Sequence, residues 1–158
     1  MWIKGITDED FINYKVPSMF IATATCSFKC DKEFGQPVCQ NGALAKQPDL
    51  EVSMLGLLDR YQRNPISRAI VFGGLEPFDD PDVMILIGLI RAAGITNDIV
   101  IYTGYNRDEI EEKVNFLGSH YSGIVIKFGR YIPGQKPHFD PVLGVNLASD
   151  NQYAERIS

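Results

Sequence analysis

The sequence predicts a single α/β domain built around a parallel β-sheet, and three observations support this fold class. Short, nearly continuous apolar segments, typical of buried parallel strands, alternate along the chain with segments of helical periodicity. The length of 158 residues suits one domain with a sizeable core and is short for two. Hydrophobic residues make up 45% and charged residues 22%, which is the composition of a folded globular protein rather than a disordered one.

The predicted strands are short apolar segments, and the predicted helices have apolar residues spaced three and four apart. We expect strands over residues 18–25, 67–72, 98–102 and 124–128, and a shorter one over 142–148. We expect helices over residues 50–61, 81–93 and 107–117. The middle helix is the best defined, because Asp80 is a favourable N-cap, Pro81 suits the first helical position and Gly94 suits the end.

Residues 27–48 show no clear periodicity and follow directly from the first predicted strand. Structureless segments of this length are uncommon inside compact domains and usually carry function. Open α/β sheets also bind their ligands at the carboxyl ends of the strands. We therefore treat residues 26–48 as the candidate binding loop.

All three cysteines of the chain, Cys26, Cys30 and Cys39, lie in this loop. An odd number of clustered thiols does not fit the disulfide framework of a secreted domain and favours metal ligation. Iron–sulfur clusters ordinarily take four cysteines, so three would leave one iron open for another ligand. Two alternatives remain, a zinc site completed by His120 or His138, and free buried thiols.

A second motif, Gly73-Gly74-Leu75-Glu76-Pro77, follows the predicted strand over residues 67–72. The two glycines permit a positive φ and let a ligand approach the backbone closely. Glu76 would place a carboxylate beside backbone carbonyls, and such acceptors suit an ammonium group. Taken alone, the motif is also explained by an ordinary turn between a strand and a helix. It indicates a binding site only in combination with the cysteine loop.

Together these motifs resemble those of the radical-SAM superfamily, whose cysteines follow the first strand and whose GGEP-type motif follows the second. Most of the chain is similar to the activating proteins of anaerobic ribonucleotide reductases. The similar segments are Cys39-Gln40-Asn41, residues 73–77, Tyr102-Thr103-Gly104-Tyr105, residues 127–131 and residues 146–152. The chain departs from the family at one point, because eight residues separate Cys30 from Cys39 where the family usually has two.

The resemblance implies an incomplete parallel β/α barrel of the radical-SAM type over residues 1–158. It also implies a [4Fe–4S] cluster on the three cysteines, S-adenosylmethionine on the open iron, and no catalytic residue beyond the cluster ligands. The residues implied to bind S-adenosylmethionine are Val38, Asn41, Gly73, Gly74, Leu75, Glu76, Pro77, Thr103 and Tyr105. Val38 would pack near the adenine, and residues 73–77 would bind the methionine ammonium.

The implied function is reductive cleavage of S-adenosylmethionine, with an electron from a flavodoxin- or ferredoxin-type donor. The resulting radical would activate a glycine of a large glycyl-radical enzyme, in the first place an anaerobic ribonucleotide reductase. One alternative is a small-molecule radical-SAM enzyme. Another is a zinc- or iron-binding interaction module without this chemistry.

The insertion between the second and third cysteines, residues 31–36, is charged and contains Gly35. We expect it to be an exposed excursion that shapes partner recognition and leaves the cluster chemistry unchanged. Asp79, Asp80 and Asp82 are expected to be caps or solvated charges, and Glu109 to lie on the wet face of a helix.

The charge pattern and the hydropathy bear on partners and location. The net charge of −5, without a basic cluster, disfavours direct nucleic-acid binding. No stretch approaches the roughly 18 apolar residues of a membrane span, and the first residues lack the apolar core of a signal peptide. We therefore expect a cytoplasmic protein that does not contact membranes.

Overall fold

The computed structural model describes residues 1–158, and seven of its strands form one sheet in the order β3-β1-β2-β4-β5-β6-β9. The four central strands are parallel neighbours, as their apolar character predicts. They are β2 (Ser18–Thr23), β4 (Ala69–Gly74), β5 (Asp98–Tyr102) and β6 (Ile124–Phe128). The predicted bounds of β5 and β6 are confirmed, and those of β2 and β4 differ by two residues.

Three antiparallel strands that the sequence did not predict flank this parallel centre. β1 (Trp2–Asp10) pairs with β2, β3 (Leu50–Glu51) pairs with β1, and β9 (Tyr153–Arg156) pairs with β6. β1 and β9 mix charged and apolar residues, because these outer strands are partly exposed. β3 occupies the first residues of the helix predicted over 50–61. The sheet is therefore mixed rather than wholly parallel.

Three main helices connect the parallel strands: α3 (Met54–Arg63), α4 (Pro81–Ala92) and α5 (Glu111–His120). Helix α3 begins where the Ser53 hydroxyl accepts a hydrogen bond from the Gly56 N–H at 3.3 Å. Asp80 caps α4 as predicted, since its carboxylate accepts from the Asp82 N–H at 3.0 Å. The helix predicted over 107–117 begins instead with a 3₁₀ turn, η2 (Arg107–Ile110), and continues as α5.

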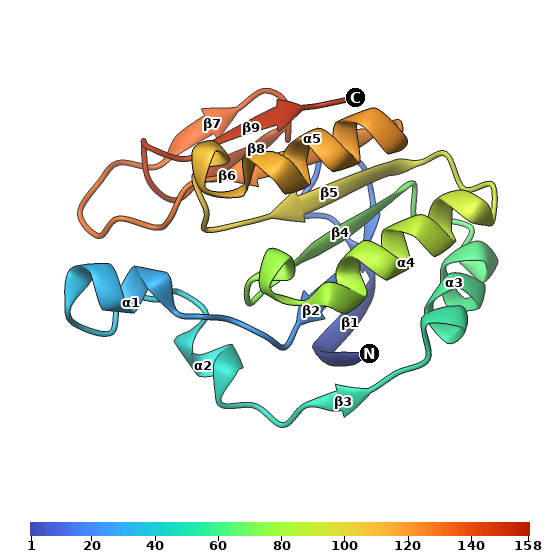
Figure 1. The fold of residues 1–158 in the computed structure, drawn as a ribbon, viewed down its shortest axis with the longest axis horizontal. Coiled ribbons are helices and arrows are strands. Elements are labelled where there is room, and N and C mark those ends of the chain that lie inside the picture. Colours follow the sequence, from blue (N-terminus) through green and yellow to red (C-terminus); the bar gives the residue numbers. More distant parts are fainter.

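The side chains of the central strands alternate between two apolar layers. The larger layer packs under the helices, of which α4 and α5 lie on the viewer's side of the sheet in Figure 1. The smaller layer, on the other face, includes Val71 and Val125. Tyr14, Leu143 and Leu147 cover it. Leu147 lies in a small hairpin of β7 (His138–Asp140) and β8 (Val145–Leu147). The strand predicted over 142–148 is thus shorter than expected and corresponds to β8.

The candidate binding loop lies beyond the carboxyl ends of the parallel strands, at the left of Figure 1. It contains two short helices, α1 (Lys29–Phe34) and α2 (Gly42–Ala45), that the sequence did not predict. Residues 32–37 are exposed, as expected for the insertion, whereas Asp31 is half-buried. Elsewhere, too, the helices are short, and none is long and apolar enough to cross a membrane.

Candidate functional site

A cavity of about 400 Å³ lies at the carboxyl ends of the parallel strands. Its walls come from the candidate binding loop, the glycine turn after β4, the ends of β5 and β6, and residues 146–152. Ten of the twelve predicted site residues line it: Cys26, Cys30, Cys39, Asn41, Gly73, Gly74, Leu75, Glu76, Thr103 and Tyr105. The other two do not, since Val38 lies outside the lining and Pro77 begins a buried 3₁₀ turn, η1 (Pro77–Asp79).

The three cysteine thiols are free and half-buried in this cavity. Burial raises the pKa of the Cys26 thiol, and the carboxylates of Glu76 and Asp79 raise it further. Burial and the neighbouring Cys39 thiol raise the pKa of Cys30 to about 11. Cys26 and Cys30 are therefore protonated at neutral pH in the metal-free protein, and iron bound at these sulfurs would displace the protons.

The backbone between the first two cysteines is strained at Phe28, the one non-glycine residue with a positive φ, of 52°. Bulky residues are disfavoured in this left-handed region. The conformation lets the Phe28 N–H donate to the Cys26 sulfur at 3.2 Å and starts helix α1, which carries Cys30. The strained residue thus sets the direction of the chain between the two thiols.

The third cysteine is positioned by the first residue of the insertion. One carboxylate oxygen of Asp31, Oδ1, accepts hydrogen bonds from the N–H groups of Val38 and Cys39, both at 2.8 Å. Asp31 therefore closes the loop that returns the chain to the site. This contact revises the expectation that the whole insertion is separate from the cluster chemistry, because Asp31 supports a predicted ligand.

The glycine turn requires glycine at Gly74, which has a φ of +83°. A β-carbon at this position would lie 3.0 Å from Cα of Ala22, so a side chain would be strained by the backbone conformation and would also press against Ala22. The Gly74 carbonyl accepts a hydrogen bond from the side-chain amide of Asn41. Asn41 thereby ties the segment after Cys39 to the glycine turn.

Glu76 joins two strand ends through a carboxylate that accepts three hydrogen bonds. Its Oε1 accepts from the Phe78 N–H at 3.1 Å and from the Thr103 hydroxyl at 2.7 Å, and its Oε2 accepts from the Gly104 N–H at 2.8 Å. Burial raises the pKa of Glu76, although these bonds favour the charged form. Holding the turn after β4 against the end of β5 is a role that the sequence did not indicate.

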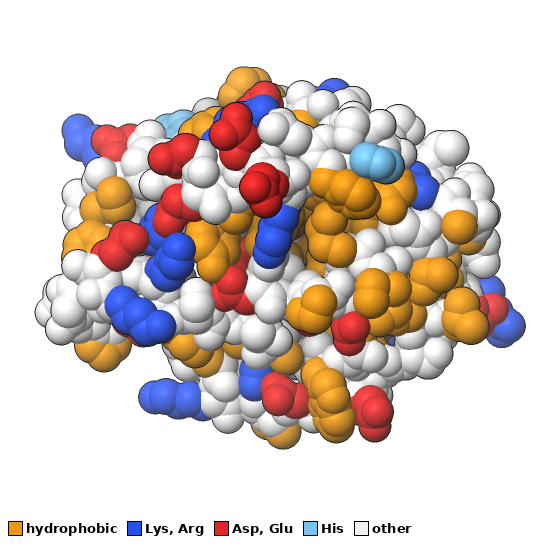
Figure 2. Space-filling view, viewed as in Figure 1, with side chains coloured by type: hydrophobic (Ala, Val, Ile, Leu, Met, Phe, Trp, Pro, Cys, Tyr) orange, Lys and Arg blue, Asp and Glu red, His pale blue; other side chains and the backbone are white.

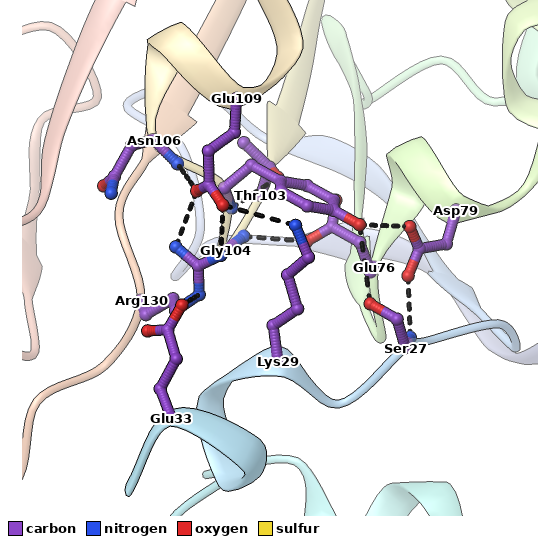
Figure 3. A network of polar contacts seen from close by, with 11 residues as sticks. Ser27, Lys29, Glu33, Glu76, Asp79, Thr103, Gly104, Asn106, Glu109 and Arg130 are labelled. Carbon is purple, nitrogen blue, oxygen red and sulfur yellow. Dashed lines mark hydrogen bonds and ion pairs between the residues drawn. The ribbon is translucent and has the colours of Figure 1, made fainter.

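Asp79 attaches the cysteine loop to the same turn. Its carboxylate accepts from the Ser27 N–H at 2.7 Å (Figure 3). It also accepts from the Tyr105 hydroxyl at 2.5 Å. The hydroxyls of Ser27 and Tyr105 lie 3.4 Å apart. The prediction of a cap or solvated charge is therefore wrong for Asp79, which holds the residue that follows Cys26.

Four charged residues, here called the α1 clamp, hold helix α1 against the ends of η2 and β6 (Figure 3). Arg130, only 7% exposed, donates hydrogen bonds of 2.6 and 2.7 Å to the Glu109 carboxylate. From α1, Lys29 lies 3.3 Å from Glu109, and Glu33 lies 3.3 Å from Nε of Arg130. The Arg130 hydrogen bonds lower the pKa of Glu109 to about 2. Glu109 is exposed, as expected for the wet face of a helix, but it is also paired with Arg130 and Lys29, which the sequence did not indicate.

Two side-chain amides fasten residues 146–152 over the end of β6. Asn151 donates to the Arg130 carbonyl at 2.9 Å, and Gln152 donates to the Gly129 carbonyl at 3.2 Å. The Gln152 side chain also accepts from the Ala148 N–H at 3.0 Å. The Asn-Gln pair of this segment therefore fixes one wall of the cavity.

The donor set of the cavity fits an iron–sulfur cluster. Such clusters take thiolate ligands, and three thiols are present. A zinc site would need a fourth ligand, and neither His120 nor His138 lines the cavity. No group of three or more histidine, cysteine, aspartate or glutamate side chains is gathered closely enough to hold a single metal ion.

Comparison with known proteins returns no relative: no family model, no curated protein and no solved structure matches this chain.

Among the site residues, the α1 clamp could not be predicted from the sequence, because isolated acidic and basic residues form no pattern. One signal was present for Glu109. It lies three residues after Asn106, the spacing of a capping box, and its carboxylate does turn back to accept from the Asn106 N–H.

Proposed function

We propose that this protein is a radical-SAM enzyme that binds a [4Fe–4S] cluster at its three cysteines and cleaves S-adenosylmethionine reductively. One observation carries the proposal: three free thiols and a glycine turn with a left-handed residue line a single cavity of about 400 Å³. Three thiolates leave one iron of a cubane cluster without a protein ligand. The glycine turn offers bare backbone to a ligand in the same cavity.

In this proposal the parts of the cavity have separate tasks. With the cluster bound, one electron from a reduced flavodoxin- or ferredoxin-type donor would break a sulfonium C–S bond of S-adenosylmethionine, giving methionine and a 5′-deoxyadenosyl radical. The backbone at Gly74 would receive the methionine ammonium, and Glu76 would keep the turn and the end of β5 together. Thr103 and Tyr105 would form the wall next to the adenosine. The α1 clamp would hold the cysteine loop.

We further propose that the substrate is a protein. The radical would take a hydrogen atom from a glycine Cα of a large glycyl-radical enzyme, in the first place an anaerobic ribonucleotide reductase, and become 5′-deoxyadenosine. The filling of the second sheet face by Tyr14, Leu143 and Leu147 supports this choice, because it leaves little space for a small substrate beside the cofactors. The mixed sheet would then serve as the incomplete barrel of the family, in a reducing cytoplasm where thiols stay free for iron.

Metal content tests the proposal. Anaerobic reconstitution of the wild-type protein should give about four irons and four sulfides per chain. Each of Cys26→Ala, Cys30→Ala and Cys39→Ala should lose most of both, whereas Ser27→Ala, a matched change in the cavity wall, should keep them. Retention of a full cluster by all three cysteine variants, or one zinc in the wild type, would contradict the assignment.

Electron paramagnetic resonance tests the partner. Dithionite-reduced protein with S-adenosylmethionine should produce a doublet signal only when the cognate glycyl-radical enzyme is added. The doublet is expected because the unpaired electron couples to the remaining Cα hydrogen. Deoxyadenosine formed equally with small metabolites alone, without a protein radical, would instead support the small-molecule alternative.

A further inference from the structure

Lys127 is a buried lysine in the wall of the cavity. The neighbours of Lys127 in β6, Ile126 and Phe128, point into the helix-covered layer, so Lys127 lies on the opposite face, paired with Tyr102 of β5. Lys127 is 7% exposed and still lines the cavity. No task described above uses it.

The partners of the Lys127 ammonium are backbone carbonyls. Its Nζ donates to the Gly129 carbonyl at 2.7 Å, and the Thr103 carbonyl lies 3.5 Å away. No ion pair of the protein includes Lys127. The charge of Glu76 raises the pKa of Lys127, but the hydrogen bonds of the Glu76 carboxylate come from Phe78, Thr103 and Gly104 and not from Lys127. An ammonium carries three N–H groups, so at least one has no protein partner.

An ammonium in this position is unfavourable unless an anion joins it. Burial accordingly lowers the pKa of Lys127 to about 7. The two other basic residues that line the cavity, Lys29 and Arg130, are both paired with Glu109. Lys127 is therefore the one basic side chain of the cavity that forms no ion pair.

We propose that Lys127 binds a carboxylate that enters with the ligand, namely the α-carboxylate of the methionine moiety of S-adenosylmethionine. The inference rests on the proposed function and adds to it the residue that recognises this charge. Phosphate sites present several converging donors, often with arginine, whereas this part of the cavity offers one ammonium. The glycine turn and Lys127 together match a zwitterionic amino-acid group, with acceptors for its ammonium and a donor for its carboxylate.

The test compares two ligands in three proteins. S-adenosylmethionine and its decarboxylated analogue are titrated calorimetrically, without oxygen, into cluster-loaded wild type, Lys127→Met and Lys113→Met. Lys113 is the matched control, because its ammonium also donates to a backbone carbonyl, that of Phe78, but outside the cavity. Lys127→Met should fold with an unchanged or higher melting temperature, since it removes an unpaired buried charge.

We expect Lys127→Met to weaken S-adenosylmethionine by about tenfold or more, the size of a charged hydrogen bond. The affinity for the decarboxylated analogue should change by less than about twofold, because this ligand lacks the carboxylate that Lys127 would bind. Comparing the two ligands in the same variant cancels any other effect of the substitution on the cavity. Lys113→Met should change neither affinity. This difference between the two ligands, in Lys127→Met alone, would support the proposal.

Two results would overturn the inference while leaving the proposed function intact. Equal weakening of both ligands would show that Lys127 shapes the cavity and does not recognise the carboxylate. If Lys127→Met bound S-adenosylmethionine as the wild type does but bound the partner protein more weakly, the carboxylate that Lys127 binds would belong to the partner protein. A cluster-loaded wild type that binds no S-adenosylmethionine would overturn the proposed function and this inference with it.

Discussion

Arg130 and Glu109 form a two-pronged ion pair, in which Nη1 lies 2.7 Å from Oε2 and Nη2 lies 2.6 Å from Oε1. Both partners of this pair also contact helix α1, through Glu33 and Lys29 respectively. Charged side chains of both signs accordingly gather over α1 and the start of α5, at the left of Figure 2, whereas hydrophobic side chains gather over α4 on the right. The pair therefore connects the cysteine loop to η2 and to the segment that follows β6.

Replacement of Glu109 by glutamine should loosen α1, because Lys29 loses its anion and Arg130 keeps only Glu33. The free energy of unfolding should fall by about 1–2 kcal/mol, measured by urea denaturation of the metal-free protein. Iron release from the reconstituted protein to a chelator should become faster. Glu112→Gln, on the exposed face of α5, is the control and should change neither quantity. If iron release stayed at the wild-type rate, the clamp would have no part in holding the loop.

Replacement of Asp31 by alanine should lower iron retention, since the backbone at Cys39 loses its acceptor. Lys32→Ala, on an exposed side chain of the same helix, should retain a full cluster. Deletion of residues 31–36 should also cost the cluster, contrary to the expectation from sequence. Iron and sulfide analysis after gel filtration measures all three variants, and a deletion variant with a complete cluster would restore the view of a separate excursion.

Replacement of Gly74 by alanine should destabilise the protein more than replacement of Gly35. Both glycines have positive φ values, of +83° and +65°, so each substitution costs about 1–2 kcal/mol of backbone strain. Only Gly74→Ala adds a contact of 3.0 Å with Ala22, while nothing lies near the position of a β-carbon at Gly35. Urea denaturation of the two variants measures the difference, and equal losses would show that the turn can move aside.

The stabilising effect of Lys127→Met should depend on pH. The pKa of Lys127 is about 7 in the folded protein, against about 10.4 for an unperturbed lysine. The unfolded chain therefore binds the extra proton between these values, and the wild-type protein loses stability as the pH falls from about 10 to 7. The variant should exceed the wild type by roughly 1–3 kcal/mol at pH 7, and the gap should close towards pH 10. A gap that does not vary with pH would mean that the charge is not its cause.

The central sheet could be predicted because β5 and β6 are nearly continuous apolar runs whose central residues are buried on both faces. β1 and β9 could not, since their pairing with neighbours, rather than a local pattern, makes them strands. The predicted site was found largely through short motifs, such as the segment from Cys39 to Asn41. The α1 clamp could not be predicted, because Lys29, Glu109 and Arg130 lie far apart in the sequence and only the fold brings them together.

The hydrogen bond from Asn41 to the Gly74 carbonyl links the segment after Cys39 to the glycine turn, so a shift of one would disturb the other. Two binding sites coupled in this way obey thermodynamic reciprocity. If the assembled cluster raises the affinity for S-adenosylmethionine by a given factor, bound S-adenosylmethionine must raise the affinity for the cluster by the same factor. Under the function proposed here, protein saturated with S-adenosylmethionine would lose iron from its cluster more slowly than protein without S-adenosylmethionine.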